Sequence, residues 1–173
     1  MKISVLALSV VLAVLPGCSP ELAPRPRTPL AEMAPAPEFD LENVRGGRLK
    51  SSDFEGKVLI VDFWATWCAP CKKEAPEYNA LLKKVKDKGV DVLAVTYLSG
   101  DTNDVKPFLQ EFGIEYPVAM GTDEFDSAMG GHLGLPTTFL VGKDRKIYRK
   151  IQGTVPGKIA NLEADIDELL AKP

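Results

Sequence analysis

Histidine and cysteine are scarce in this chain of 173 residues. One histidine excludes a metal cage of several imidazoles, and three cysteines cannot form two pairs of zinc-binding thiolates. The charges nearly balance, with a formal net charge of −3, so the composition gives no electrostatic basis for binding nucleic acid. No apolar run reaches the roughly 20 residues of a comfortable membrane span. The remaining composition, 45% hydrophobic and 26% charged, is typical of one globular domain, and we expect neither a metal ion nor a cofactor.

Residues 1–17 have the pattern of an export signal. Lys2 precedes an apolar run of 13 residues that ends at Leu15, which suits the apolar core of a secretory signal. The string Leu15-Pro16-Gly17-Cys18 then resembles a bacterial lipoprotein processing site. We therefore expect a lipid on Cys18 that holds the protein at a membrane of the cell envelope, facing the periplasm or the extracytoplasmic space. The alternative is an ordinary cleaved signal that leaves Cys18 as a stray thiol.

A proline-rich stretch separates this signal from the rest of the chain. Six prolines lie between Ser19 and Pro37. Because proline fixes one backbone dihedral and lacks an N–H donor, we expect this stretch to stay out of sheets and helix interiors. Residues 18–37 are therefore predicted to be an extended tether, and residues 38–173 a single folded domain.

The predicted domain alternates between strand and helix patterns, which indicates a layered α/β architecture. A β-branched and aromatic run at 57–64 is apolar on both faces, as in central strands covered by helices. Apolar residues at helical spacing follow it, from Ala75 to Val85. The other expected elements are a hairpin at 39–49, strands at 90–97, 137–141 and 147–151, and helices at 105–112 and 156–170.

Two cysteines lie where the central strand passes into the long helix. The N-terminus of a helix presents unpaired amide donors and a partial positive charge, and both stabilise a thiolate. Cys68 is therefore predicted to be the more reactive and more exposed sulfur, and Cys71, one turn later, the buried sulfur that resolves a mixed disulfide. A c-type haem attachment would need histidine after Cys71, where the chain has Lys72. A purely structural disulfide would constrain little of the unfolded chain, because its loop is so short.

The stretch from Val61 to Lys72 resembles the active-site segment of thioredoxin. With the tether, the lead-in hairpin and the segment from Gly134 to Phe139, the chain is similar to membrane-anchored thiol-disulfide oxidoreductases of the TlpA/ResA type. The resemblance implies a thioredoxin-like fold with a central mixed β-sheet flanked by helices, an N-terminal β-hairpin and a central helical insertion. It also implies disulfide-containing envelope proteins as substrates, a membrane thiol as electron donor, and a place in cytochrome c maturation.

The resemblance further implies two proton carriers for Cys71. Thioredoxin has an aspartate where this chain has Asp62, whereas the TlpA/ResA type uses a helix glutamate where this chain has Glu74. Asp62 interrupts an apolar strand, so burial should raise its pKa. Because a strand interior is drier than a helix face, we assign the larger part of the proton exchange to Asp62.

A substrate-binding surface is expected around the cysteines. The resemblance implies a cis peptide bond at Leu135-Pro136, in a loop that faces the cysteines and offers its backbone to an extended substrate. The residues expected to bind substrate are Trp67, Ala69, Pro70, Leu135 and Pro136. The dipeptide Ala69-Pro70 lacks the histidine that stabilises the thiolate of strong oxidants, which favours a reductase.

Two other functions use the same cysteines. One is a thiol peroxidase of the peroxiredoxin type, although Thr66 lies two residues before Cys68, and that family has its threonine three before. The other is a copper chaperone with Cys68, Cys71 and His132 as ligands, although chaperones of this fold separate their cysteines by three residues rather than two. A lone histidine in a glycine-rich loop is more often a surface residue.

Overall fold

The computed structural model describes residue 30, residues 33–132 and residues 134–172. The predicted signal of residues 1–17 and the expected lipid site Cys18 lie outside the described residues. The strands are β1 (Asp40–Glu42), β2 (Arg48–Lys50), β3 (Val58–Trp64), β4 (Val90–Thr96), β5 (Val118–Met120), β6 (Thr137–Val141) and β7 (Ile147–Gln152). The helices are α1 (Ala69–Val85), α2 (Thr102–Glu111), α3 (Asp123–Ala128) and α4 (Lys158–Leu170), with short 3-10 helices η1 (Ser51–Phe54) and η2 (Lys86–Lys88). Within this described part, no helix combines the length and the apolar character needed to cross a bilayer.

A mixed sheet of five strands forms the centre of the molecule, in the order β5-β4-β3-β6-β7. β3 pairs in parallel with β4 and antiparallel with β6. All seven residues of β3 are buried, which confirms that this strand is covered on both faces. β1 and β2 form a separate antiparallel hairpin, as expected from the sequence.

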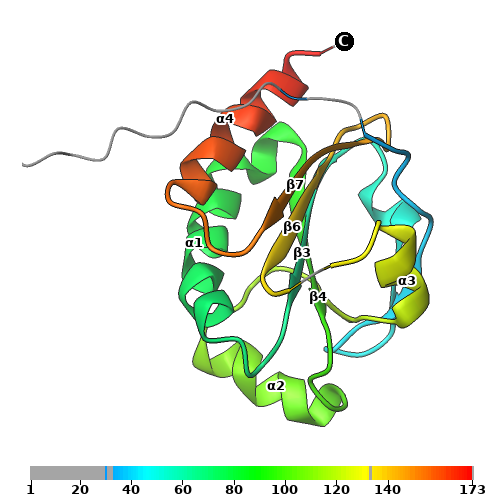
Figure 1. Ribbon diagram of the computed structural model, residues 1–173, viewed down its shortest axis with the longest axis vertical. Helices are drawn as coiled ribbons and strands as arrows, with labels where there is room; N and C mark the ends of the chain where they lie inside the picture. Colours follow the sequence, from blue (N-terminus) through cyan, green and yellow to red (C-terminus); the bar gives the residue numbers. More distant parts are fainter. Residues whose placement is uncertain (1–29, 31–32, 133, 173) are drawn as a thin grey trace, which may run out of the picture.

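The helices α1 and α4 cover one face of the sheet, and α3 lies across the other face (Figure 1). Successive side chains of a strand point to opposite faces. In β3, Ile60 and Trp64 belong to the core on the side of α1, whereas Val61 and Phe63 belong to the core on the other side. Asp62 shares the parity of Ile60 and Trp64, so its carboxylate points toward α1.

The sequence patterns did not predict two elements of the insertion between β4 and β6. β5 has three residues and α3 has six, and both are too short for a hydrophobic period to develop. A local signal for α3 was present, because Thr122 is followed by Asp123 and Glu124. The Thr122 hydroxyl caps the helix by accepting from the Phe125 amide, and carboxylates in the first turn favour a helix start.

Residues 33–36 of the proline-rich stretch bind the edge of the sheet beside β7, although they are not a strand of it. The Met33 amide donates to the Ile147 carbonyl at 2.8 Å, and the Ile147 amide donates to the Ala34 carbonyl at 2.8 Å. Pro35 bridges Lys146 in antiparallel fashion. Proline is tolerated here because β7 is an edge strand, where a missing N–H donor can face away from the ladder.

Candidate active site

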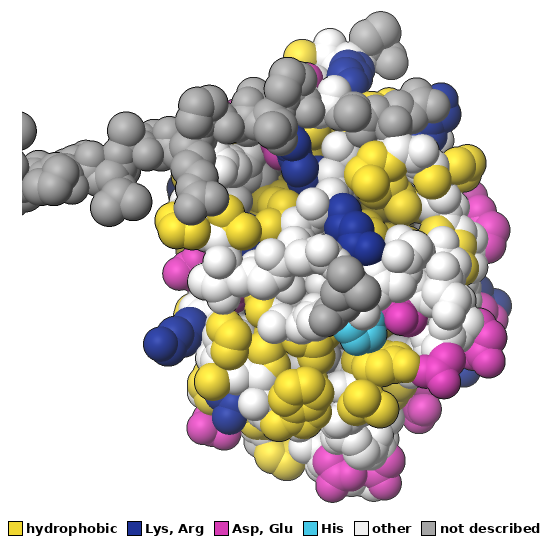
Figure 2. Space-filling view, viewed as in Figure 1, with side chains coloured by type: hydrophobic (Ala, Val, Ile, Leu, Met, Phe, Trp, Pro, Cys, Tyr) yellow, Lys and Arg dark blue, Asp and Glu magenta, His cyan; other side chains and the backbone are white. Residues whose placement is uncertain are grey.

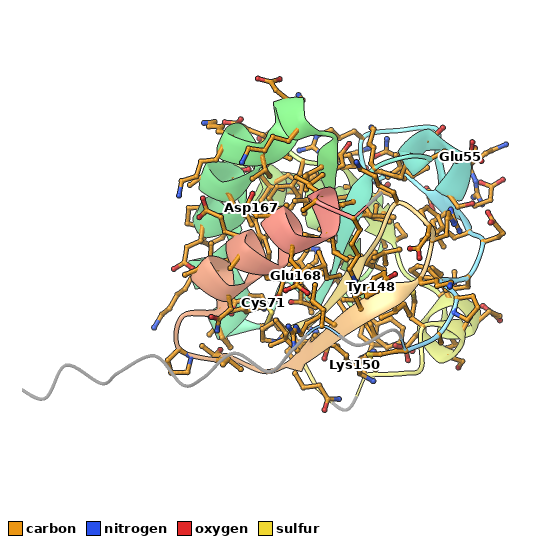
Figure 3. All side chains as sticks on the ribbon, turned by 90° about the horizontal axis from the view of Figure 1, so that it is seen from above. Glu55, Cys71, Tyr148, Lys150, Asp167 and Glu168 are labelled. Carbon is orange, nitrogen blue, oxygen red and sulfur yellow. A yellow bond between two sulfur atoms is a disulfide. The ribbon has the colours of Figure 1, made fainter. Side chains whose placement is uncertain are left out.

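The Cys68–Cys71 disulfide lies at the point where the chain leaves β3 and begins α1. Cys68 is the N-cap of α1, and its sulfur accepts a hydrogen bond from the Cys71 amide at 3.3 Å. The Cα atoms of the two cysteines are 5.3 Å apart. Pro70, in the first turn, has the backbone angle of a helix and no donor to leave unpaired. Figure 3 labels Cys71 in the first turn of α1. The local sequence therefore places a sulfur at the positive end of the helix dipole.

The two sulfur-bearing residues are buried to the same extent, with 4% of Cys68 and 5% of Cys71 exposed. The prediction that Cys68 is the more exposed of the pair is therefore wrong for the disulfide-bonded protein. The bond holds both sulfur atoms at the first turn of α1.

An apolar rim made of Trp67 and Leu98 lies beside the disulfide. Trp67 is 61% exposed and Leu98, in the loop after β4, is 74% exposed. The Trp67 indole N–H donates to the Leu98 carbonyl at 2.9 Å, and the Thr66 amide donates to the Ser99 hydroxyl at 3.0 Å. Leu98 has a φ of 51°, a left-handed conformation that costs a leucine about 1–2 kcal/mol. Figure 2 shows hydrophobic side chains gathered on this lower part of the molecule. The rim offers two large apolar side chains to a partner.

The loop before β6 lies at the same end of the sheet as the disulfide. Thr137, the first residue of β6, pairs with Phe63 near the end of β3. The peptide bond between Leu135 and Pro136 is cis. Leu135 is half-buried and Pro136 is buried, and the Pro136 carbonyl accepts from the Gly153 amide at 2.8 Å. Strand pairing therefore brings this loop to the end of β3 that leads into the disulfide.

Behind the disulfide, Asp62 of β3 and Glu74 of α1 meet a buried ammonium group. Lys158, the first residue of α4, donates to Glu74 Oε2 at 2.7 Å and lies 3.8 Å from Asp62 Oδ1. Asp62 Oδ1 also accepts from the Tyr78 hydroxyl at 3.0 Å and from the Thr138 hydroxyl at 2.7 Å. All five residues are less than 9% exposed. The structure thus brings the two predicted carboxylates into one network.

Burial governs the electrostatics of this network. Removal from water raises the pKa of Asp62, and the Lys158 ammonium and the two hydroxyl donors oppose that rise only in part. Burial likewise raises the pKa of Glu74, again against the hydrogen bond from Lys158. Burial raises the pKa of Tyr78 well above its ordinary value, and the nearby Asp62 carboxylate adds to the rise. Tyr78 therefore stays a neutral hydrogen-bond donor, while both carboxyl groups are suited to hold a proton nearer to neutral pH.

A family model described as the AhpC/TSA family matches residues 33–150. The chain belongs to the AhpC/TSA family. Among AhpC/TSA relatives, the thiol-disulfide oxidoreductase ResA of Bacillus thuringiensis subsp. konkukian (strain 97-27) is 38% identical over 120 residues, which cover 68% of this chain and 68% of the relative. ResA of Bacillus subtilis (strain 168) is 36% identical over 127 residues, which cover 73% and 70%.

Solved structures extend the same similarity to the fold. A crystal structure from Chlorobium tepidum, described as a thiol:disulfide interchange protein DsbE, superposes with a TM-score of 0.74 at 34% identity. The superposition covers 83% of this chain and all of that one, 100%. A thioredoxin family protein from Chlorobium tepidum TLS gives a TM-score of 0.72 at 30% identity, over 82% and 99%. These findings confirm the thioredoxin-like fold within the AhpC/TSA family.

Lys158 of this AhpC/TSA chain is a member of the buried network that was not predicted from the sequence. A signal was available, because Lys158 precedes Leu162 by four residues and so lies on the same stripe of α4 as Leu162, Ile166 and Leu169. A lysine on the buried stripe of an amphipathic helix needs a carboxylate partner inside the fold. The sequence could not indicate that the partners are Glu74 and Asp62, which lie far away along the chain.

His132 of this AhpC/TSA chain lies apart from the cysteines. Its ring stacks on Phe63, with centroids 5.6 Å apart, and meets Tyr97 edge-on at 4.8 Å. Its Nδ1 atom contacts Asp126 of α3, on the face of the sheet opposite α1. Within the described residues, no group of three histidine, cysteine or acidic side chains is close enough to hold a metal ion. The geometry therefore gives the copper-chaperone alternative no support.

Proposed function

We propose that this protein is a thiol-disulfide oxidoreductase that reduces disulfide bonds in proteins of the cell envelope. The observation that carries the proposal is the Cys68–Cys71 disulfide at the start of α1, with the exposed side chains of Trp67 and Leu98 beside it. A helix N-terminus favours a thiolate, and an apolar rim favours a protein partner over a small polar molecule. The names of the ResA and DsbE relatives support the same chemistry.

The reaction transfers two electrons to the partner. The Cys68 thiolate of the reduced protein attacks one sulfur of the partner disulfide, whose bond breaks, and a mixed disulfide forms while the partner's other sulfur leaves as a thiolate. The Cys71 thiolate then attacks Cys68 and releases the partner's remaining sulfur. The partner leaves reduced, and the protein is left with its Cys68–Cys71 disulfide. A dithiol donor, for which we propose a membrane thiol protein, restores the reduced form.

The partner binds as an extended segment along the loop before β6. The cis Leu135–Pro136 segment lies at the disulfide end of the sheet and can present backbone groups in the manner of an added strand. Trp67 provides the apolar contact on one side of the cysteines, and Ala69 and Pro70 lie between them. The small Ala69 leaves room for a partner close to the Cys68 sulfur.

Proton exchange with Cys71 is assigned to the buried carboxylates. Loss of the Cys71 proton makes the attacking thiolate, and its return completes the reduced state. Asp62 carries the larger part of this exchange in our proposal, with Glu74 as the second carboxylate of the network.

We also propose that Cys18 carries a lipid and that electrons reach substrates of cytochrome c maturation. The sequence before Cys18 supports the first statement, and the resemblance to the TlpA/ResA type supports the second. Labelling with a fatty acid tests the anchor: the label is expected on the wild type and absent from Cys18→Ala. Label on both forms, or on neither, would contradict it.

The experiment for the main proposal is trapping of the mixed disulfide. Cys71→Ser should accumulate a covalent complex with an envelope protein disulfide, because Cys68 still attacks but nothing resolves the product. Cys68→Ser is the matched control and should trap nothing. In the wild type, a reduction potential of about −270 mV for the Cys68–Cys71 pair supports a reductase. A value of about −120 to −180 mV would mean that the protein oxidises its partners instead. Rapid peroxide consumption without trapping would indicate the peroxidase instead.

A further inference from the structure

The two carboxylates behind the disulfide are not equivalent. Lys158 Nζ is 2.7 Å from Glu74 Oε2 but 3.8 Å from Asp62 Oδ1. Only the first distance is a hydrogen bond. The Lys158 side chain is 3% exposed, so its ammonium group must be matched by a nearby anion. Glu74 is the group that makes the direct ion pair.

Asp62 is held by neutral donors instead. Its Oδ1 atom accepts from the Tyr78 and Thr138 hydroxyl groups. One ammonium group cannot neutralise two carboxylates, so a cluster with both carboxyl groups ionised has an excess buried negative charge. Binding one proton relieves that charge, and the carboxyl group without the direct ion pair is the favourable place for it.

The surroundings separate the two carboxylates further. Asp62 and Cys71 line the same small cavity, together with Trp64, Ala75 and Tyr116. Glu74 and Lys158 line a different space, a surface groove that also contacts Pro70 and Pro156. Asp62 therefore shares a space with the resolving sulfur, and the ion pair lines a separate one.

We propose that Lys158 is a positioning residue that holds Glu74 as its counter-ion and thereby leaves Asp62 as the group that exchanges a proton with Cys71. This deepens the proposed function and rests on it. The Asp62 carboxylate takes the proton of the Cys71 thiol, and the Cys71 thiolate attacks Cys68 in the mixed disulfide. The bond between Cys68 and the partner breaks, and the partner leaves as a thiolate, so Asp62 keeps the proton until the next reduction.

The groups that face Asp62 come from several elements. α1 contributes Cys71, Glu74 and Tyr78, α4 contributes Lys158, the segment before β5 contributes Tyr116, and β6 contributes Thr138. Among these groups, the Glu74 carboxylate and the Lys158 ammonium act on Asp62 with opposite signs. Their removal should therefore move the proton exchange of Asp62 in opposite directions.

The test uses the reduced protein and an aromatic disulfide whose thiolate product is coloured. Attack by Cys68 releases the first coloured thiolate, and attack by Cys71 on the mixed disulfide releases the second. The rate of the second release as a function of pH reports the resolving step. In Glu74→Gln, a neighbouring anion is gone and the ammonium faces Asp62 alone, so the midpoint should move to lower pH, by about 1 pH unit.

Lys158→Met should move the midpoint to higher pH by a similar amount, because Asp62 loses its only nearby cation in the described network. Lys158→Arg is the matched control and should keep the wild-type midpoint. Should Lys158→Met fail to fold, Glu74→Gln with Lys158→Met removes the pair as a unit, and its midpoint should fall between those of the two single variants.

A collapse of the plateau rate in Glu74→Gln would overturn the inference, because Glu74 would then be the proton carrier itself. Equal midpoints in all variants would overturn it as well. The wild type separates this failure from failure of the proposed function. A wild type that releases no second thiolate lacks the exchange chemistry. If the wild type releases it and the midpoints of the variants shift in the wrong direction, only the role of Lys158 is contradicted.

Discussion

Asp62→Asn should stabilise the protein at neutral pH, although it removes a residue of the candidate active site. Asparagine has nearly the shape of aspartate, and its side-chain oxygen can accept the same hydrogen bonds from Tyr78 and Thr138. The change removes a buried charge, and Lys158 keeps Glu74 as its partner at 2.7 Å. A buried carboxylate that shares its cation with another carboxylate is a cost to the folded state.

The pH dependence gives the magnitude and the sign. Burial raises the pKa of Asp62 in the folded protein above its ordinary value of 3.8. The folded state therefore binds more protons than the unfolded state between these two values, and stability falls as pH rises through that window. The slope for one proton is at most about 1.4 kcal/mol per pH unit. Below pH 3.8 the two proteins should agree within about 1 kcal/mol. The advantage of Asp62→Asn then grows with pH, and levels off once Asp62 is ionised in the folded protein.

Urea unfolding of the oxidised protein measures this directly. Tryptophan fluorescence from Trp64 and Trp67 follows the transition at a series of values between about pH 4 and pH 8. Asp87→Asn, at an exposed position of η2, is the matched control and should stay within about 0.5 kcal/mol of the wild type. Parallel curves of unfolding free energy against pH for the wild type and Asp62→Asn would refute the reasoning. They would mean that the pKa of Asp62 is the same in the folded and the unfolded protein.

Two further predictions concern other parts of the molecule. Arg149→Gln should lower the free energy of unfolding by about 3–5 kcal/mol in urea, because Asp165, which is 0% exposed, would lose the guanidinium that binds it at 2.7 and 2.8 Å; a loss below about 1 kcal/mol would contradict this. Leu98→Gly should slow reduction of a protein disulfide and leave reduction of a small aromatic disulfide unchanged, since only a protein partner reaches the rim. Equal slowing of both reactions would show instead that Leu98 acts on the cysteines themselves.

The parts of the fold that the sequence predicted correctly are those with strong local chemistry. The run from Val58 to Trp64 is apolar on both faces, and such a run fits a central strand and little else. The cysteines at the start of α1 are recognisable because a helix N-terminus and two sulfurs one turn apart suffice for the chemistry. Asp62 was recognisable because it interrupts an apolar strand, whereas Glu74 was indicated by the resemblance to the TlpA/ResA type.

The features that escaped depend on contacts between distant parts of the chain. The sequence places Lys158 on the buried stripe of α4, but its partner Glu74 lies 84 positions earlier and cannot be found from a local pattern. Residues 33–36 belong to the proline-rich stretch, and their hydrogen-bond partners come from β7 and the residues just before it. We attribute the equal burial of Cys68 and Cys71 to the disulfide bond between them, and no local sequence pattern predicts that burial.

The pairing of Met33 with Ile147 determines at which end of the sheet the described chain begins relative to the active site. Ile147 is aligned with Val141, and Val141 with Leu59 near the beginning of β3, whereas the disulfide follows the last residue of β3. Met33 and the disulfide therefore lie at opposite ends of the sheet, separated by a strand of seven residues, or about 20 Å. In Figure 1 the first described residues, in blue, lie near the top and α2 lies near the bottom. If Cys18 carries the lipid that we propose, the chain that leads from it joins the sheet at the end opposite to the cysteines.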